Sequence, residues 1–266
     1  MGHVGTLDPS ATGLLVVCIG HATKISSFLT ISDKIYQTDI CLGKTTTTYD
    51  AEGETVSEKN AEHITKQNVL DLLPSFHGEQ EQIPPMFSAV KIAGKKLYQY
   101  ARANQEVDVP SRKVSVESFQ LISFANPLAT LEIACSKGTY VRSLVHDLGQ
   151  KLGVGASVVT IRRLKSGSFT LEHAVKLEDV LEMDLEKIVE RVVPVSQVLE
   201  NHFHTVMVEK KDEERILHGV EYPKSQIAQQ GFDLNSMFLF VSEETKKEIA
   251  IGQWGLADKI MIKRVF

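Results

Sequence analysis

Strand-length apolar runs in the middle of the chain place the tightest limits on what it can fold into. Residues 34–42 (KIYQTDICL) predict one strand, and residues 113–124 and 129–136 predict two more, joined at Asn126-Pro127. A fourth strand, with arginines at its end, is predicted over residues 157–164. Because helical patterns lie between and after these strands, we expect a fold of mixed α and β structure.

Three segments predict helices. Residues 61–73 have helical spacing, and residues 141–152 repeat apolar side chains every 3.6 residues. Residues 177–192 predict an acidic amphipathic helix that crosses to a second unit. From about Phe203 the pattern is one of short strands, which a small β-barrel of about 60 residues fits.

Composition excludes several classes of protein. The 266 residues are 42% hydrophobic and 24% charged, which is typical of a soluble globular chain, and no apolar run approaches the ~20 residues of a membrane span. The start has no signal-peptide pattern, and three widely spaced cysteines predict reduced thiols, so we expect a cytoplasmic protein. No zinc, Walker or dinucleotide motif is found, so we expect neither a metal nor a cofactor.

The net charge of −5 is unevenly distributed. Acidic residues concentrate after residue 172, whereas lysines and arginines concentrate earlier, so an anionic partner should meet the first two-thirds of the chain. Residues 80–112 form a long basic excursion in which Pro84-Pro85 and Gly94 surround a short helical stretch over 96–102. A segment of this kind is more often a functional loop than a plain connection.

The first candidate site is the glycine-rich segment GHVGTLDPSATG at residues 2–13. Glycines allow a backbone to approach a ligand closely, and Pro9 keeps Asp8 out of helical geometry. The commoner alternative is that Asp8 caps a turn and His3 is a surface imidazole.

Two further candidates follow along the chain. Tyr36 lies on a predicted strand, where it either packs against the sheet or offers a stacking platform to a nucleobase. The Thr45–Thr48 run with Asp50 is more consistent with a solvated loop than with a site.

The segment CSKGTYVR places Tyr140 and Arg142 in the first turn of a predicted helix. A helix dipole does not favour a cation there, so Arg142 either faces solvent or pairs with a buried carboxylate. Arg162 and Arg163 suggest a phosphate contact, although a solvated pair fits equally well.

Five motifs, taken together and in order, resemble the bacterial TruB family, the tRNA pseudouridine-55 synthases. They are GHVGTLDPSATGLLVVCIGHATK, KIYQTDICLGKTTTTYDAEG, QIPPMFSAVKIAGKKLYQYAR, CSKGTYVRSLVHDLGQKLG and IRRLKSGSF. The resemblance is strong over residues 2–171 and weaker over 203–266, where members of that family carry a PUA-like RNA-binding domain.

The resemblance implies an α+β pseudouridine-synthase fold with a mixed, largely antiparallel central sheet and flanking helices. The catalytic domain is expected over residues 1–195, with an RNA-clasping thumb insertion at about 82–112. A PUA-like β-barrel domain is expected over residues 203–266. Members of the family also carry a K-P-x-G-x-T-S segment ahead of the first motif, whereas this sequence begins at that motif. We therefore expect either a start further upstream or the loss of a sheet strand.

The resemblance also assigns roles. Asp8 is the expected catalytic aspartate, Arg142 pairs with it, and Tyr36 stacks on the flipped uracil and is proposed to take its C5 proton. The expected substrate contacts are His3, which wedges into the vacated base stack, Tyr140 of the KGTYxR motif, and Ile161 in the uracil pocket. The thumb residues expected to contact RNA are Lys91, Lys95, Lys96, Arg102 and Arg112.

The activity implied is conversion of a T-loop uridine of tRNA to pseudouridine by a monomeric isomerase without a metal or cofactor. A noncatalytic tRNA-binding or folding protein is the alternative if an amino-terminal segment is truly absent. A guide-RNA-dependent synthase of the archaeal and eukaryotic type is a third possibility, which the compact thumb and short tail disfavour.

Overall fold

The structure is a computed structural model that describes residues 1–200, 202–227 and 231–266. It divides into two compact units. One comprises residues 3–17 and 27–174, and the other comprises residues 1–2, 18–26 and 175–266. None of the helices in the described residues has the length and apolar character needed to cross a membrane.

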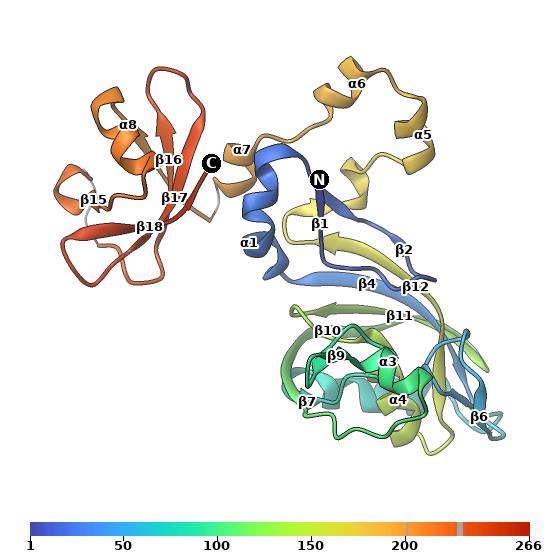
Figure 1. Cartoon of the computed structure of the whole chain (residues 1–266). Coiled ribbons are helices and arrows are strands. Elements are labelled where there is room, and N and C mark those ends of the chain that lie inside the picture. The colour runs from blue at the N-terminus through green and yellow to red at the C-terminus, as the bar shows by residue number, and fades with distance from the viewer. Residues whose placement is uncertain (201, 228–230) are drawn as a thin grey trace. The chain divides into compact units, whose positions relative to one another are not determined.

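The larger unit is built on a mainly antiparallel sheet in the order β13-β12-β4-β11-β10-β7 (Figure 1). Strand β2 (Thr12–Gly13) adds to β12 in parallel. The other strands are β4 (Lys34–Leu42), β7 (Gly78–Gln82), β10 (Arg112–Ala125), β11 (Leu128–Cys135), β12 (Ala156–Ser166) and β13 (Phe169–Thr170). The four strands expected from the sequence are thus confirmed, and they are the four central strands.

Helix α4 (Val141–Lys151) covers one face of this sheet. Its apolar stripe, Leu144, Val145 and Leu148, is fully buried against strand residues such as Ile40 and Leu131. Burying each such side chain is worth about 1.5–3 kcal/mol, so this interface anchors the start of α4 where Tyr140 and Arg142 lie.

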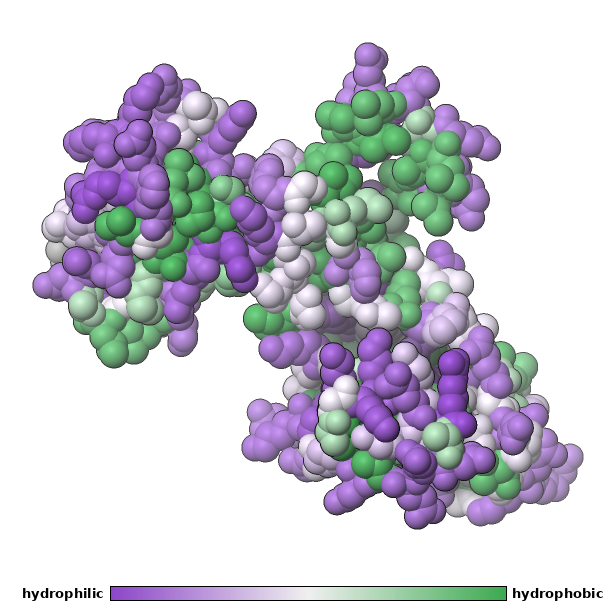
Figure 2. Space-filling view, viewed as in Figure 1, coloured by the Kyte–Doolittle hydropathy of each residue, from purple (hydrophilic) through white to green (hydrophobic). Residues whose placement is uncertain are grey.

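Two helical predictions are corrected in extent. The segment 61–73 begins its helix only at Lys66, where Thr65 and Asn68 form a capping box, so α2 is Lys66–Leu72 and a 3₁₀ turn (Leu73–Phe76) follows. The predicted helix over 177–192 is broken at Met183, whose extended backbone separates two short helices. Figure 2 shows the apolar side chains of these two helices on the surface. The helices are α5 (Leu177–Glu182) and α6 (Leu185–Glu190).

Between β7 and β10 lies the basic excursion. It contains a two-stranded hairpin of β8 (Lys91–Ile92) and β9 (Lys95–Lys96), followed by α3 (Leu97–Arg102). Leu97 is fully buried, and Pro84, Pro85 and Ser88 are buried as well, so the excursion is anchored at several points although its lysines are largely exposed. A second hairpin, β5 (Lys44–Thr46) with β6 (Thr55–Glu58), follows β4.

The smaller unit contains a five-stranded half-barrel in the order β14-β16-β17-β18-β15, with its own aromatic core. The strands are β14 (His204–Val208), β15 (Tyr222–Pro223), β16 (Met237–Ser242), β17 (Glu248–Trp254) and β18 (Lys259–Val265). The sequence did not predict its helix α8 (Lys210–Leu217), which packs on β17.

The remaining elements are short. Strand β1 (Gly2–Val4) begins the glycine-rich segment, and β3 (Val16–Cys18) follows it. The other helices are α1 (Ser26–Thr30) and α7 (Val195–Leu199), with 3₁₀ turns at Gly20–Ile25, Leu171–His173 and Lys224–Gln226.

Candidate active site

A buried arginine joins two carboxylates at the start of α4. Arg142 is only 4% exposed, and its Nε lies 2.8 Å from Asp8 Oδ2, an ion pair without good hydrogen-bond alignment at Nε. Its Nη1 lies 3.4 Å from Asp50 Oδ2. The solvent-facing alternative for Arg142 is therefore wrong, and burial beside two carboxylates explains a cation at the start of a helix.

The same guanidinium is fixed by backbone oxygens. Nη1 donates to Thr48 O at 3.0 Å and Nη2 donates to Phe87 O at 3.1 Å. Arg142 therefore contacts three separate segments, and its position is set by the fold before any substrate arrives.

Asp8 lies in a turn. The amide of Ala11 donates to Asp8 O at 2.9 Å, and Pro9 follows Asp8 directly. The Asp8 side chain is 33% exposed, so its carboxylate meets Arg142 on one side and remains open to solvent on the other. A carboxylate that is both oriented and accessible suits nucleophilic or base chemistry.

The structure corrects the interpretation of residues 45–50 as a solvated loop. Thr46 is 1% exposed and Asp50 is 7% exposed. Asp50 accepts hydrogen bonds from the Thr48 hydroxyl and from the Glu52 amide, and Thr46 Oγ1 donates to Asp50 O. This turn delivers both Asp50 Oδ2 and Thr48 O to Arg142, so Asp50 is a site residue that the sequence analysis missed.

Tyr36 and Ile161 lie on the same face of the sheet. Tyr36 is opposite Arg163 across the β4–β12 pair, and Thr38 is opposite Ile161. Directly opposed residues in antiparallel strands point to one side, so β4 and β12 present these side chains together. Burial raises the pKa of the Tyr36 hydroxyl, and the charge and hydrogen bond of Arg163 act in the opposite direction.

Tyr140 precedes α4 as its N-cap residue. The buried side-chain amide of Gln82 forms two hydrogen bonds with the Tyr140 backbone. It accepts from Tyr140 N at 2.8 Å and donates to Tyr140 O at 3.1 Å. Arg112 lies over the Tyr140 ring at 4.9 Å, and its Nη2 is buried without a partner among the described residues. Arg112 therefore lies against the expected uracil-contacting tyrosine, at the base of the basic excursion.

The other expected contacts are exposed. His3 is a surface residue on β1, and Lys91, Lys95 and Arg102 are exposed on the excursion, where Lys96 is half-buried. In contrast, Arg163 is 1% exposed and donates to backbone oxygens, so the suggested phosphate contact is wrong for Arg163. The alternation of a strand could have revealed this, because Arg163 follows the buried Ile161 by two residues whereas Arg162 faces the other way.

In the described part of the chain, no three His, Cys, Asp or Glu side chains converge in a way that could hold a metal ion.

Two family profiles together match residues 1–200. "TruB family pseudouridylate synthase (N terminal domain)" matches residues 1–141, and "tRNA pseudouridylate synthase B C-terminal domain" matches residues 142–200. The chain belongs to the TruB family. Asp8, Asp50 and Tyr36 lie within the first matched region, and Arg142 is the first residue of the second.

Relatives named tRNA pseudouridine synthase B are similar to this TruB-family chain over most of its length. The relative from Clostridium perfringens (strain 13 / Type A) is 38% identical over 239 residues, which are 90% of this chain and 80% of the relative. The one from Symbiobacterium thermophilum is 43% identical over 222 residues, covering 82% and 72%. The one from Pseudomonas aeruginosa is 49% identical over 177 residues, covering 66% and 58%.

Solved structures confirm the fold. A chain of a Cbf5-Nop10-Gar1 complex superposes with a TM-score of 0.72 at 22% identity, covering 100% of this chain and 75% of that one. A chain of an H/ACA RNP bound to a substrate RNA gives a TM-score of 0.70 at 20% identity, with the same coverage. The α+β pseudouridine-synthase fold that we expected is therefore confirmed for this TruB-family chain.

Proposed function

We propose that this TruB-family chain converts uridine 55 of the tRNA T-loop to pseudouridine, with Asp8 as the catalytic carboxylate. The observation that carries the proposal is the ion pair of Asp8 with the buried Arg142, on the sheet face that also presents Tyr36. Relatives named tRNA pseudouridine synthase B support tRNA as the substrate class. The expected setting is the cytoplasm, and the expected working form is a monomer.

The reaction is an isomerisation. The N1–C1′ bond of uridine breaks, the uracil turns, and a C5–C1′ bond forms, while the C5 proton leaves and N1 gains one. Asp8 serves this exchange by attack at C1′, by attack at C6 or by removing the C2′ proton, and each route needs an ionised, aimed carboxylate. A nearby cation favours the ionised form, which is the role proposed for Arg142.

Tyr36 and Ile161 are proposed to receive the uracil after it leaves the loop stack. Unstacking costs a few kcal/mol, which aromatic stacking on Tyr36 and contact with Ile161 offset. Burial favours the neutral Tyr36 hydroxyl, which is not itself a base, so Tyr36 is proposed to take the C5 proton as it passes its own hydroxyl proton on to water. We propose that Tyr140 contacts the uracil beside Tyr36 and Ile161. His3 is proposed to fill the space that the flipped base leaves in the loop stack.

The exposed cations of residues 82–112 are proposed to hold the tRNA backbone. Lys91, Lys95 and Arg102 are solvent-exposed and make no ion pair with a carboxylate among the described residues. Phosphate contacts of this kind fix register without reading sequence.

The test is tritium release from a T-arm RNA labelled with [5-³H]uridine, comparing the full chain with Asp8→Asn. Release by the parent and none by the variant, which keeps the shape of the side chain, supports the proposal. A parent that binds the RNA but releases no tritium contradicts it and favours the noncatalytic tRNA-binding alternative. Activity that appears only when a guide RNA is added would point to the guide-dependent type.

A further inference from the structure

Arg163 is the largest of the almost completely buried side chains among the described residues, and no carboxylate there pairs with its charge. It is 1% exposed, and no Asp or Glu of the described residues lies within ion-pair distance of it. Burying an arginine without a counterion costs several kcal/mol unless its donors are well satisfied. The fold therefore keeps this charge in place by other contacts, and those contacts indicate its role.

Both of the recorded donor contacts end on the loop that carries Asp8. Arg163 Nε donates to Leu14 O at 2.7 Å, and Nη2 donates to Gly5 O at 3.1 Å. Gly5 and Leu14 bracket Asp8 on either side. One rigid guanidinium thus closes the loop at both of its ends.

The backbone of β12 strengthens the closure. Leu14 N donates to Arg163 O at 2.8 Å, and Gly13 pairs with Arg163 in the parallel β2–β12 ladder. Gly13 has a φ of +95°, and a Cβ there would lie 2.3 Å from Arg163 O. The loop can approach Arg163 this closely only because residue 13 is glycine.

The other neighbour of Arg163 is Tyr36. The two residues are directly opposed across β4 and β12, and Arg163 lies close enough to the Tyr36 hydroxyl to act against the rise in its pKa that burial causes. Arg163 is therefore the point at which the Asp8 loop and the Tyr36 strand meet.

We propose that Arg163 is a positioning residue, which sets the distance between the Asp8 carboxylate and the Tyr36 ring by clamping the Asp8 loop to the strand beside Tyr36. The inference rests on the proposed function and adds a residue to it. In the described part of the chain Asp8 pairs with Arg142 and not with Arg163, so Arg163 is proposed to act through the loop and not on the reacting atoms. The guanidinium group is planar and has donors in fixed directions, so it can reach Gly5 O, Leu14 O and Tyr36 together. A lysine ammonium group cannot do this.

The test uses Arg163→Met and Arg163→Lys in the full chain, with single-turnover tritium release and RNA affinity measured separately. Arg163→Met should lower the rate at saturating RNA about 100-fold, because misplacing a catalytic group by about 1 Å costs this much. Its dissociation constant for the RNA should change less than about 3-fold, since Arg163 is buried away from solvent. Arg163→Lys keeps the charge and one carbonyl contact, so it should recover about 10-fold of the lost rate.

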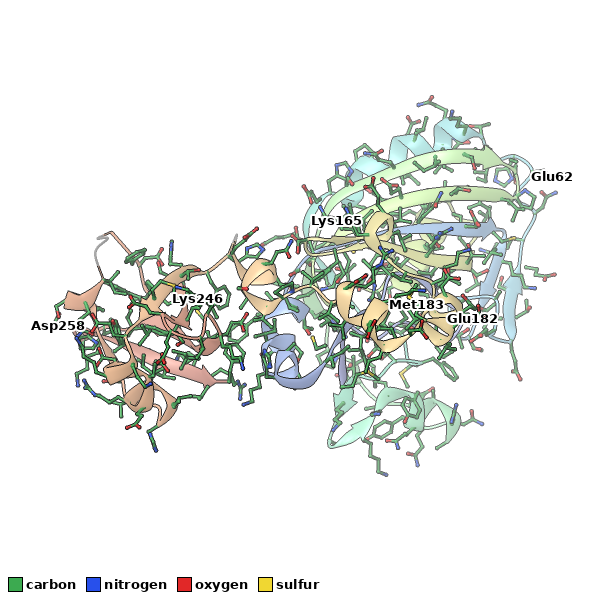
Figure 3. All side chains as sticks on the ribbon, turned by 90° about the horizontal axis from the view of Figure 1, so that it is seen from above. Glu62, Lys165, Glu182, Met183, Lys246 and Asp258 are labelled. Carbon is green, nitrogen blue, oxygen red and sulfur yellow. The ribbon has the colours of Figure 1, made fainter. Side chains whose placement is uncertain are left out.

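Lys165→Met is the matched control. Lys165, labelled in Figure 3, is an exposed cation on the same strand, and its variant should keep the parental rate within about 2-fold. Rates are expressed per folded molecule, with the folded fraction taken from near-ultraviolet circular dichroism. If Arg163→Met does not fold, Arg163→Lys carries the test with the same pair of measurements.

The outcomes separate the two proposals. A parent that releases no tritium defeats the proposed function and this inference together. An active parent with folded Arg163 variants that match its rate overturns the inference alone. Variants that lose RNA affinity and keep the saturated rate would overturn it as well, because a positioning residue acts on the chemical step.

Discussion

The larger unit holds two groups of basic side chains in opposite ways. Arg142 and Arg163 are 4% and 1% exposed and contact carboxylates and backbone oxygens. The cations of residues 82–112 are largely exposed, and their recorded partners are tyrosine rings. The two buried arginines lie in a low-dielectric environment, where their charge fixes the positions of the groups around them. The exposed cations of the excursion are free to meet an anion, and salt screens their charge.

This difference predicts different consequences of removing a charge. Loss of Arg142 leaves carboxylates without a partner and loss of Arg163 leaves backbone oxygens without a donor, so either loss should lower both the stability and the rate of the chemical step. An exposed lysine leaves nothing unsatisfied, so its loss should lower only the affinity for RNA and its dependence on salt. The distinction between buried and exposed cations is contradicted if variants of both kinds change stability, rate and RNA affinity in the same way.

The largest effect is expected from Arg142→Met. Asp50 is buried and loses its cation, while Asp8 loses its orientation. We expect a loss of about 3 kcal/mol in the free energy of unfolding, at the low end for a buried pair because Asp8 is one-third exposed, and a fall in tritium release of about 10³-fold or more. Urea unfolding and single-turnover assays measure the two effects. Arg191→Met, at an exposed arginine after α6, is the control and should change neither.

A smaller effect is expected from Asp50→Asn. The amide preserves the shape of the turn and can still accept from Thr48, but the charge 3.4 Å from Arg142 Nη1 is lost. We expect a rate loss of about 10-fold and a stability loss of about 1–2 kcal/mol. Asp71→Asn, at an exposed aspartate of α2, serves as control. An Asp50 variant with the full parental rate would show that Asp8 alone is enough to orient Arg142.

The double variant Lys91→Gln/Lys95→Gln tests the exposed group. If both lysines contact phosphates, RNA affinity should fall about 3–10-fold, and the slope of log K against log salt should fall by about 1.4, at about 0.7 per contact on a single-stranded loop. Affinity measured by filter binding across a salt series gives both values. The saturated rate should stay within about 2-fold of the parent. Lys176→Gln/Lys187→Gln, at exposed lysines of the smaller unit, is the charge-matched control, and an equal slope change there would contradict a local role for the excursion.

The central strands of the larger unit, and the helix α4 that packs on them, were predicted well from the sequence. The segment predicted at 34–42 is β4 residue for residue, and the periodic stripe after Tyr140 is the buried side of α4. Local patterns carry this information, because strand alternation and helical spacing repeat within a few residues. The resemblance to the TruB family added roles for Asp8 and Tyr36 that periodicity could not supply.

What the sequence did not predict depends on contacts between distant segments. Asp50 is buried only because its hairpin reaches Arg142, 92 positions later in the chain, and a Thr-rich turn is typical of a solvated loop until that contact exists. Arg112 was grouped with the excursion, yet it lies over Tyr140 because β10 begins there. Neighbouring arginines with opposite burial, Arg162 and Arg163, show how one position along a strand changes the environment of a charge completely.

The smallest effect at neutral pH is expected from a buried group that carries no charge there. Burial raises the pKa of the Cys135 thiol from 9.0 to about 11. Because the folded state holds this proton more tightly than the unfolded chain, the stability it contributes is complete below about pH 9 and is lost as the pH rises towards 11. The free energy of unfolding should therefore fall more steeply between about pH 9 and 11 in the parent than in Cys135→Ala, by about 2 kcal/mol at most.

Urea unfolding at a series of pH values measures this difference. Tyrosines and lysines remote from Cys135 cancel in the comparison, whereas Tyr36 and Lys34, whose pKa values the Cys135 charge raises, add a smaller difference of the same origin. Equal slopes in the two proteins would mean that the thiol ionises as easily in the sheet as in the unfolded chain. The contrast between the buried and the exposed groups would then not extend from arginines to other ionisable side chains.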